Sequence, residues 1–165
     1  MDAAGKSEPD DEPISYEAIL DAVGLDDALW CCQVEPQHAG LWRRFAVWSA
    51  RQVQYLMTDQ RSIAALDVAE RHANGDATDQ ELAAARAAAW AASDADWAAK
   101  AAALAAALAA GDAAQAARAA ALVAWAAPRA ARDAPRAAQS AAFRQLVTTG
   151  TLPAVQQKAV QEVSA

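Results

Sequence analysis

The sequence predicts an all-α protein, a single-domain helical bundle of about six to seven helices with an alanine-rich C-terminal half. Alanine, the best helix former, makes up nearly a third of the 165 residues. Strand-forming residues never alternate with polar residues over a useful length. Two kinds of residue divide the chain into segments of helix length. Residues that favour helix N-caps mark the starts, and glycines mark the ends.

Composition and charge narrow the classes of function. The net charge is −7 and the pI is 4.7, which disfavours nucleic-acid binding and fits a basic protein partner or solubility alone. No apolar run reaches membrane-spanning length, and the acidic residues 1–13 lack the apolar core of a signal peptide. Cys31 and Cys32 are adjacent, and adjacent cysteines rarely form a disulfide, so we expect reduced thiols packed on a helix. We therefore expect a cytoplasmic protein.

Three segments make up the expected domain plan. Residues 1–13 are polar, acidic and contain proline, so we expect them to be disordered. Residues 14–150 form the all-helical domain. Residues 151–165 are expected to be a partly ordered tail with a frayed helical turn.

The N-terminal half is punctuated clearly enough to place helix ends. Ser15 caps a first helix that Gly24 ends, and Asp59 caps a fourth helix that Asn74 and Gly75 end. Pro36 permits a helix to begin in its first turn. The apolar arc of the third helix covers more than half of its circumference, which predicts a central helix packed on several sides. The expected spans are 15–23, 26–31, 37–57 and 59–73.

The alanine-rich half carries fewer signals. Thr78 and Glu81 form a capping box that begins a fifth helix, whose apolar stripe includes Leu82 and Trp90 and also contains Arg86. Whether residues 79–110 form one helix or two stays open. Asp112 caps a sixth helix, and a last helix over 135–148 should bury Phe143, Leu146 and Val147. Because alanine-lined helices can approach closely, self-association through residues 83–127 is an open alternative.

Four charged residues form the sharpest candidate site, namely Arg44, Arg51, Glu70 and Arg86. The helical wheel places Glu70 between Ile63 and Leu66, on the apolar side of its helix. An unpaired buried carboxylate costs several kcal/mol, so arginines on the neighbouring helices should pair with it. We favour a structural ion-pair network over a ligand-binding role. Replacing Glu70 with alanine should then destabilise the fold by roughly 1–4 kcal/mol.

A second polar group comprises Arg43, Arg61 and Arg71 with Asp59 and Asp67. On the wheels these residues face away from the apolar arcs, which favours a solvated face with ion pairs over a specific anion site. On this interpretation Arg43→Ala changes stability by no more than about 0.5 kcal/mol.

No motif for catalysis or for a cofactor is evident. His38 and His72 lack metal-ligand spacing, no other residue orients Cys31 and His38 as a catalytic pair, and there is no glycine-rich phosphate loop. We therefore predict no catalytic residue, no metal and no cofactor, and a protein that is not an enzyme. Trp30 and Trp42 lie near the N-terminal segment and are the aromatics expected in an exposed patch.

The segment from Trp42 to Ala92 carries a pattern of Arg-x-Phe-Ala, an arginine on the same helix, Thr-Asp-x-Arg-Ser, Ala-Glu-Arg and a glycine before an alanine-rich helix. The matching residues are Arg43, Phe45, Arg51, Thr58, Asp59, Arg61, Ser62, Glu70, Arg71 and Gly75. This pattern resembles that of predicted immunity proteins of bacterial polymorphic toxin systems and of related alanine-rich bacterial proteins. The match covers about a third of the chain, mainly residues 41–92.

The resemblance implies an all-α fold and an antitoxin that binds and blocks a partner toxin. We therefore predict a non-enzymatic protein-interaction module whose partner is a basic toxin encoded nearby. The alternative is a regulatory helical domain that binds a small ligand or anion through the cluster of Arg44, Arg51, Glu70 and Arg86.

Overall fold

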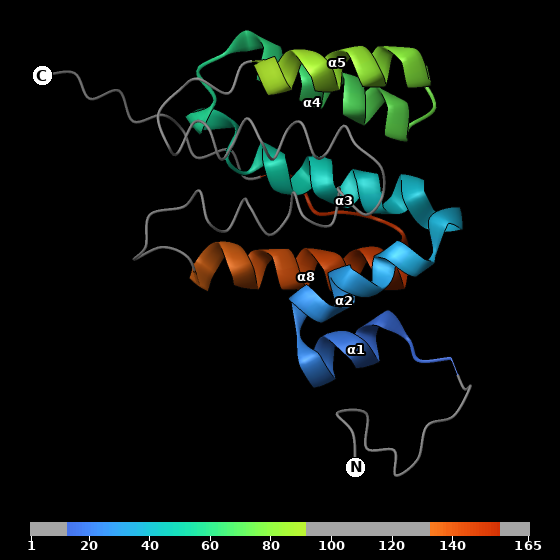
Figure 1. Ribbon diagram of the computed structural model, residues 1–165. Coiled ribbons are helices and arrows are strands. Elements are labelled where there is room, and N and C mark those ends of the chain that lie inside the picture. The colour runs from blue at the N-terminus through green and yellow to red at the C-terminus, as the bar shows by residue number, and fades with distance from the viewer. Residues whose placement is uncertain (1–12, 92–132, 156–165) are drawn as a thin grey trace, which may run out of the picture.

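The computed structural model describes residues 13–91 and 133–155, and every regular element in these ranges is a helix (Figure 1). The predicted all-α class is therefore confirmed for the described residues. The predictions for residues 1–12, 92–132 and 156–165 lie outside these ranges. The α-helices are α1 (Tyr16–Val23), α2 (Leu25–Cys31), α3 (Ala39–Arg51), α4 (Gln60–Ala73), α5 (Asp79–Ala91) and α8 (Asp133–Thr149), and short 3-10 helices span Cys32–Val34, Pro36–His38 and Gln54–Leu56.

Side chains cap the helices where the sequence predicts them. The Ser15 hydroxyl accepts a hydrogen bond from the Ala18 amide at the start of α1, and the Asp59 carboxylate accepts one from the Arg61 amide at the start of α4. Before α5, the Thr78 hydroxyl accepts from the Glu81 amide while the Glu81 carboxylate accepts from the Thr78 amide. Gly24 has a φ of 92° between α1 and α2, a conformation that favours glycine.

The central helix is shorter than predicted. The α-helical part of α3 ends at Arg51, not near residue 57, and 3-10 hydrogen bonds continue the chain from Gln52 to Met57. Such i→i+3 bonds satisfy the carbonyl groups that the end of an α-helix leaves without partners. At the other end, Pro36 begins a 3-10 turn, and α3 itself begins at Ala39.

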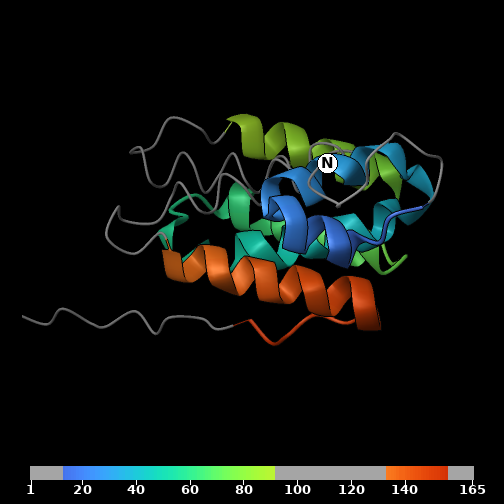
Figure 2. The same ribbon diagram turned by 90° about the horizontal axis from the view of Figure 1, so that it is seen from below.

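The position of α3 confirms that it is the central helix. It contacts α4 on one side and α8 on another, and Figure 1 shows α3 between the α4–α5 pair and α8. Eight of its 13 residues are buried. Helix α8 also contacts α1 and α2, and it runs along the edge of the molecule in Figure 2 with α1 beside it. The four helices α1, α2, α3 and α8 thus surround one hydrophobic core.

Aromatic side chains fill this core. Phe143 of α8 is fully buried, and its ring centre lies 5.3 Å from that of Phe45, 6.0 Å from that of Tyr16 and 6.1 Å from that of Trp42. Phe143 and Leu146 are buried as predicted, and Val147 packs at the margin. Because each aromatic ring buries a large apolar area, a few rings stabilise a core that alanine alone would leave weak.

Polar contacts fix α8 and the segment that follows it. Arg144 pairs with Asp21 of α1, and Arg136 pairs with Asp26 of α2. The Trp48 indole donates a hydrogen bond to the carbonyl of Pro153 over 2.7 Å. Residues 151–155 are not helical, so the predicted helical turn does not begin at Val155, which packs instead against the core.

The side of α5 that packs on α4 differs from the apolar stripe predicted for this helix. Ala65, Ala85 and Ala89 form its centre, and Leu82 is buried on the same side of α5. Trp90, which the sequence places in the apolar stripe, is 44% exposed. Small residues allow the two helices to approach closely, and a tryptophan at this contact would hold them apart. The largest apolar side chain of α5 therefore lies outside the interface.

Candidate functional site

The structure does not assemble the predicted Arg/Glu cluster. Arg51 pairs with Glu70 and with Asp67, each over 2.7 Å, but the Glu70 side chain is 54% exposed. Arg44 is exposed and Arg86 is half-buried, and neither is bonded to Glu70 in the described part of the chain. The pairing of Arg51 with Glu70 is thus present, whereas the predicted burial of Glu70 and Arg44 is wrong.

We expect Glu70→Ala to lower the free energy of unfolding by less than about 1 kcal/mol, because exposed ion pairs contribute little. Arg51 keeps Asp67 and the amide oxygen of Gln54 as partners. Urea denaturation of the wild type and of the variant measures this difference. A loss above 2 kcal/mol would mean that Glu70 is held in a buried network after all.

The predicted solvent exposure of the second polar group is confirmed for some of its members and wrong for others. Arg61 pairs with Asp59, Arg71 pairs with Glu81, and these arginines are exposed as predicted. Arg43, predicted to be solvated, is buried with 9% of its surface exposed and donates a hydrogen bond to His72 Nδ1 over 3.1 Å. Ser62 is also buried. None of these residues lines the cavity described below.

Asp59 gives α4 a pH-dependent cap. Hydrogen bonds from the side chain and then from the backbone amide of Arg61 lower the pKa of Asp59 to about 2. The unfolded value is about 3.9, so the carboxylate stabilises the fold above about pH 4 and loses this effect as the pH falls towards 2. We expect Asp59→Asn, which keeps a capping oxygen, to melt below the wild type at pH 5 and close to it at pH 2. A constant gap across this range would contradict the assigned pKa.

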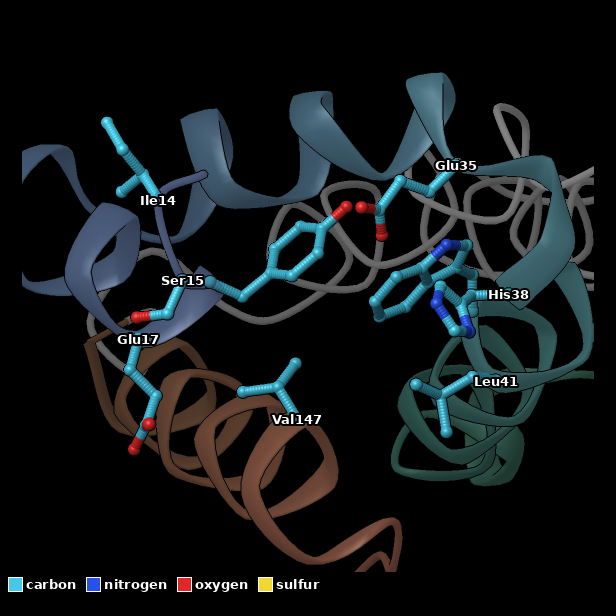
Figure 3. Close-up of a pocket in the computed structure, with 9 residues that line it drawn as sticks. Ile14, Ser15, Glu17, Glu35, His38, Leu41 and Val147 are labelled. Carbon is cyan, nitrogen blue, oxygen red and sulfur yellow. The ribbon is translucent and has the colours of Figure 1, made fainter. Parts of the chain in front are cut away.

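A cavity of about 360 Å³ lies between α1, α3, α8 and the 3-10 turns that precede α3. In Figure 3, Glu35, His38, Leu41 and Val147 converge on this space, whereas the carboxylate of Glu17 points away from it. We call it the Tyr16–Trp42 cavity after its two largest lining side chains. Its volume is in the range of small-ligand sites, about 300–1,000 Å³. The lining residues are Ile14, Ser15, Tyr16, Glu17, Glu35, His38, Leu41, Trp42 and Val147.

Tyr16 is held firmly in the wall of the cavity. Its hydroxyl donates a hydrogen bond to the carbonyl of Cys31 over 3.2 Å, and its ring centre lies 5.0 Å from that of Trp42. Burial, the neighbouring Cys32 and the Glu35 carboxylate raise the pKa of Tyr16 far above its usual value. The phenol therefore stays protonated and acts as a hydrogen-bond donor beside Glu35.

Trp42 also lines this cavity, and its indole nitrogen is buried. The residue is only 4% exposed, so the prediction that it forms an exposed patch is wrong. Its indole Nε1 is buried and has no hydrogen-bond partner among residues 13–91 and 133–155. The edge of His38 contacts the indole, with ring centres 6.1 Å apart. Leaving a buried donor without an acceptor is costly.

The cysteines nearby are not activated. Both are free, and Cys32 donates a hydrogen bond to the carbonyl of Ala28. Burial raises the pKa of Cys32 to about 12 and, with the charge of Asp27, raises that of Cys31. Because the thiolate is the reactive form, neither thiol is prepared for nucleophilic attack. The cavity is therefore better suited to binding a ligand than to nucleophilic attack by either of these thiols.

A second feature adjoins the cavity along the chain. Trp30 is 67% exposed, as predicted, and Val34 is also exposed. Trp30 lies near the end of α2 and Val34 at the end of the 3-10 helix that follows it, and Asp27 lies one turn before Trp30. We call Asp27, Trp30 and Val34 the Trp30 surface. Glu35 follows directly and joins this surface to the Tyr16–Trp42 cavity.

Sequence reasoning named Trp30, Trp42 and His38 but missed Tyr16 and Glu35. One available signal was the proline after Glu35, which disfavours helical geometry at the preceding residue. Glu35 is accordingly outside helical geometry, with φ −122° and ψ 69°. The spacing of four between His38 and Trp42 was a second available signal, because it is typical of residues that share a helix face. The contact with Tyr16 depends on how α1 packs, which no local pattern specifies.

Comparison of the chain with protein-family models, with curated proteins and with solved structures finds no match. Within the described ranges, no helix has the length and apolar character needed to cross a membrane. No group of three or more potential metal ligands occurs in residues 13–91 and 133–155. The fold and site geometry therefore define an all-α protein with an acid–aromatic cavity and an exposed tryptophan surface.

Proposed function

We propose that this chain is a non-enzymatic interaction module of the immunity type, a cytoplasmic antitoxin that binds and blocks a basic partner toxin. The observation that carries the proposal is Trp30, which is 67% exposed on the surface of α2. An exposed tryptophan is a frequent centre of protein interfaces, since burying it on binding contributes a large apolar area. The resemblance of residues 41–92 to predicted immunity proteins supports the same class of function.

The charge around Trp30 supports a basic partner. Asp26 and Asp27 lie in the first turn of α2, Glu35 follows Val34, and the whole chain carries a net charge of −7. Opposite charges accelerate association and exclude like-charged competitors. Because Asp26 is already paired with Arg136, Asp27 and Glu35 are the acids that best fit a partner cation.

The alternative, a regulatory module that binds a small ligand or an anion, depended on a buried cluster of arginines with Glu70. Arg44 and Glu70 are both exposed, so this cluster gives the alternative no support. The Trp30 surface is acidic and apolar, which suits a cation better than an anion.

Co-expression with the product of the neighbouring gene tests the proposal. We expect the wild-type chain to protect cells against that product and to co-purify with it. Trp30→Ala should lose both properties, whereas Trp90→Ala, which removes an exposed tryptophan from α5, should keep them. Absence of both protection and co-purification for the wild type would overturn the proposal.

A further inference from the structure

We infer that the Tyr16–Trp42 cavity receives an arginine residue of the partner protein. This inference rests on the proposed function and adds the chemistry of one contact to it. The cavity combines one inward-pointing carboxylate, Glu35, with the aromatic rings of Tyr16 and Trp42 (Figure 3). A carboxylate attracts an organic cation, and arginine packs against aromatic side chains more often than lysine does.

Glu35 retains capacity to accept a guanidinium group. A carboxylate has about four lone-pair positions, and the Tyr16 hydroxyl occupies at most one of them. The Tyr16 hydroxyl is also bonded to the carbonyl of Cys31, which fixes it beside Glu35. An arginine head group bonded to Glu35 would therefore form a charge-assisted contact without breaking the hydrogen bond from Tyr16 to Cys31.

The position of the cavity fits a partner docked on the Trp30 surface. Glu35 follows Val34, so the acid of the cavity lies next in the chain to the exposed apolar surface. A partner that covers Trp30 and Val34 would bring its neighbouring residues to the mouth of the cavity. Interfaces commonly combine an apolar centre with an arginine inserted in an adjacent pocket.

Titration with N-acetyl-L-arginine N-methylamide tests the inference without the partner. Two-dimensional NMR of the indole N–H groups reports the ligand at Trp42, with Trp30 and Trp90 as internal controls. We expect a saturable shift of the Trp42 signal, with a Kd on the order of 1–10 mM for so small a ligand. The citrulline analogue, which has the same shape and no charge, should bind at least about tenfold more weakly.

Two matched variants locate the contact. Glu35→Gln should weaken binding of the arginine compound about tenfold or more, whereas Glu70→Gln should leave it unchanged because Glu70 lies on α4 and does not line the cavity. Circular dichroism checks that both variants fold. Equal binding of the citrulline analogue, or an unchanged Kd in Glu35→Gln, would overturn the inference, as would the absence of any shift at Trp42. None of these results depends on whether a protein partner binds at Trp30, so the two proposals fail separately.

Discussion

Replacing Phe143 with alanine should lower the free energy of unfolding by about 3–5 kcal/mol, the largest loss expected from a single substitution in this chain. Phe143 is fully buried, and its ring contacts Tyr16, Trp42 and Phe45. It is thus the side chain through which α8 packs on α1 and α3 at once. Its removal leaves a cavity among the four helices, which can shift only partly to fill it.

Urea denaturation followed by circular dichroism measures this loss. Trp90→Ala removes a larger but exposed aromatic side chain and should change stability by less than about 1 kcal/mol. Domains are often stable by only about 5–15 kcal/mol, so Phe143→Leu serves as a milder variant if Phe143→Ala does not fold. A stability of Phe143→Ala within 1 kcal/mol of the wild type would show that α8 is not docked on α3 in solution.

The adjacent residues Arg43 and Arg44 should differ sharply in their contributions to stability. Arg43→Ala should cost about 1–3 kcal/mol, whereas Arg44→Ala should stay within about 0.5 kcal/mol. Arg43 is buried and donates to His72 Nδ1, while His72 Nε2 lies 2.8 Å from a carboxylate oxygen of Asp79. Because Arg43 can only donate, Nδ1 of His72 is the acceptor, and the proton on Nε2 is directed at Asp79.

This chain of contacts joins α3, α4 and α5, so its loss should affect the docking of all three. Parallel urea denaturation of the two alanine variants measures the contrast. His72→Ala should destabilise the fold to a similar extent as Arg43→Ala, and the double variant should cost less than the sum of the two. Equal stabilities of Arg43→Ala and Arg44→Ala would contradict the assigned burial.

The sequence predicted where helices begin and end better than which face each one buries. Caps act within one turn, so Ser15, Asp59 and the pair of Thr78 and Glu81 could be recognised from spacing alone. Burial depends on neighbouring helices. On α3, Arg43 lies on the same line as the buried small residues Ala46 and Ala50, three and seven positions on, and this line meets α4. A helix contacted on several sides has no clear polar edge. The helical wheel therefore predicted that Arg43 is solvated and that Arg44 is in a buried cluster, whereas Arg43 is buried and Arg44 is exposed.

The error at Glu70 has a similar origin. The buried stripe of α4 consists of Ser62, Ala65, Leu66 and Ala69, at spacings of three and four. Taking Ile63 in place of Ser62 as its first member rotates the predicted stripe by one residue and brings Glu70 into it. A serine hydroxyl gave no reason to expect burial, although its small volume suits a close helix contact.

The same limit applied to the candidate site. His38 and Trp42 share a face, and Pro36 forces Glu35 out of helical geometry, so part of the cavity was accessible from local rules. Tyr16 and Val147 reach the cavity only through the packing of α1 and α8. Their contributions required the tertiary structure.

The affinity of the chain for the product of the neighbouring gene, measured for the wild type, Trp30→Ala and Trp90→Ala, tests the central claim most directly. Both substitutions remove an exposed tryptophan, but only Trp30 belongs to the proposed binding surface. We predict that Trp30→Ala weakens binding at least about 30-fold, as for a central interface residue, and that Trp90→Ala changes it less than about threefold. Wild-type affinity in Trp30→Ala would contradict the assignment of this surface to partner recognition.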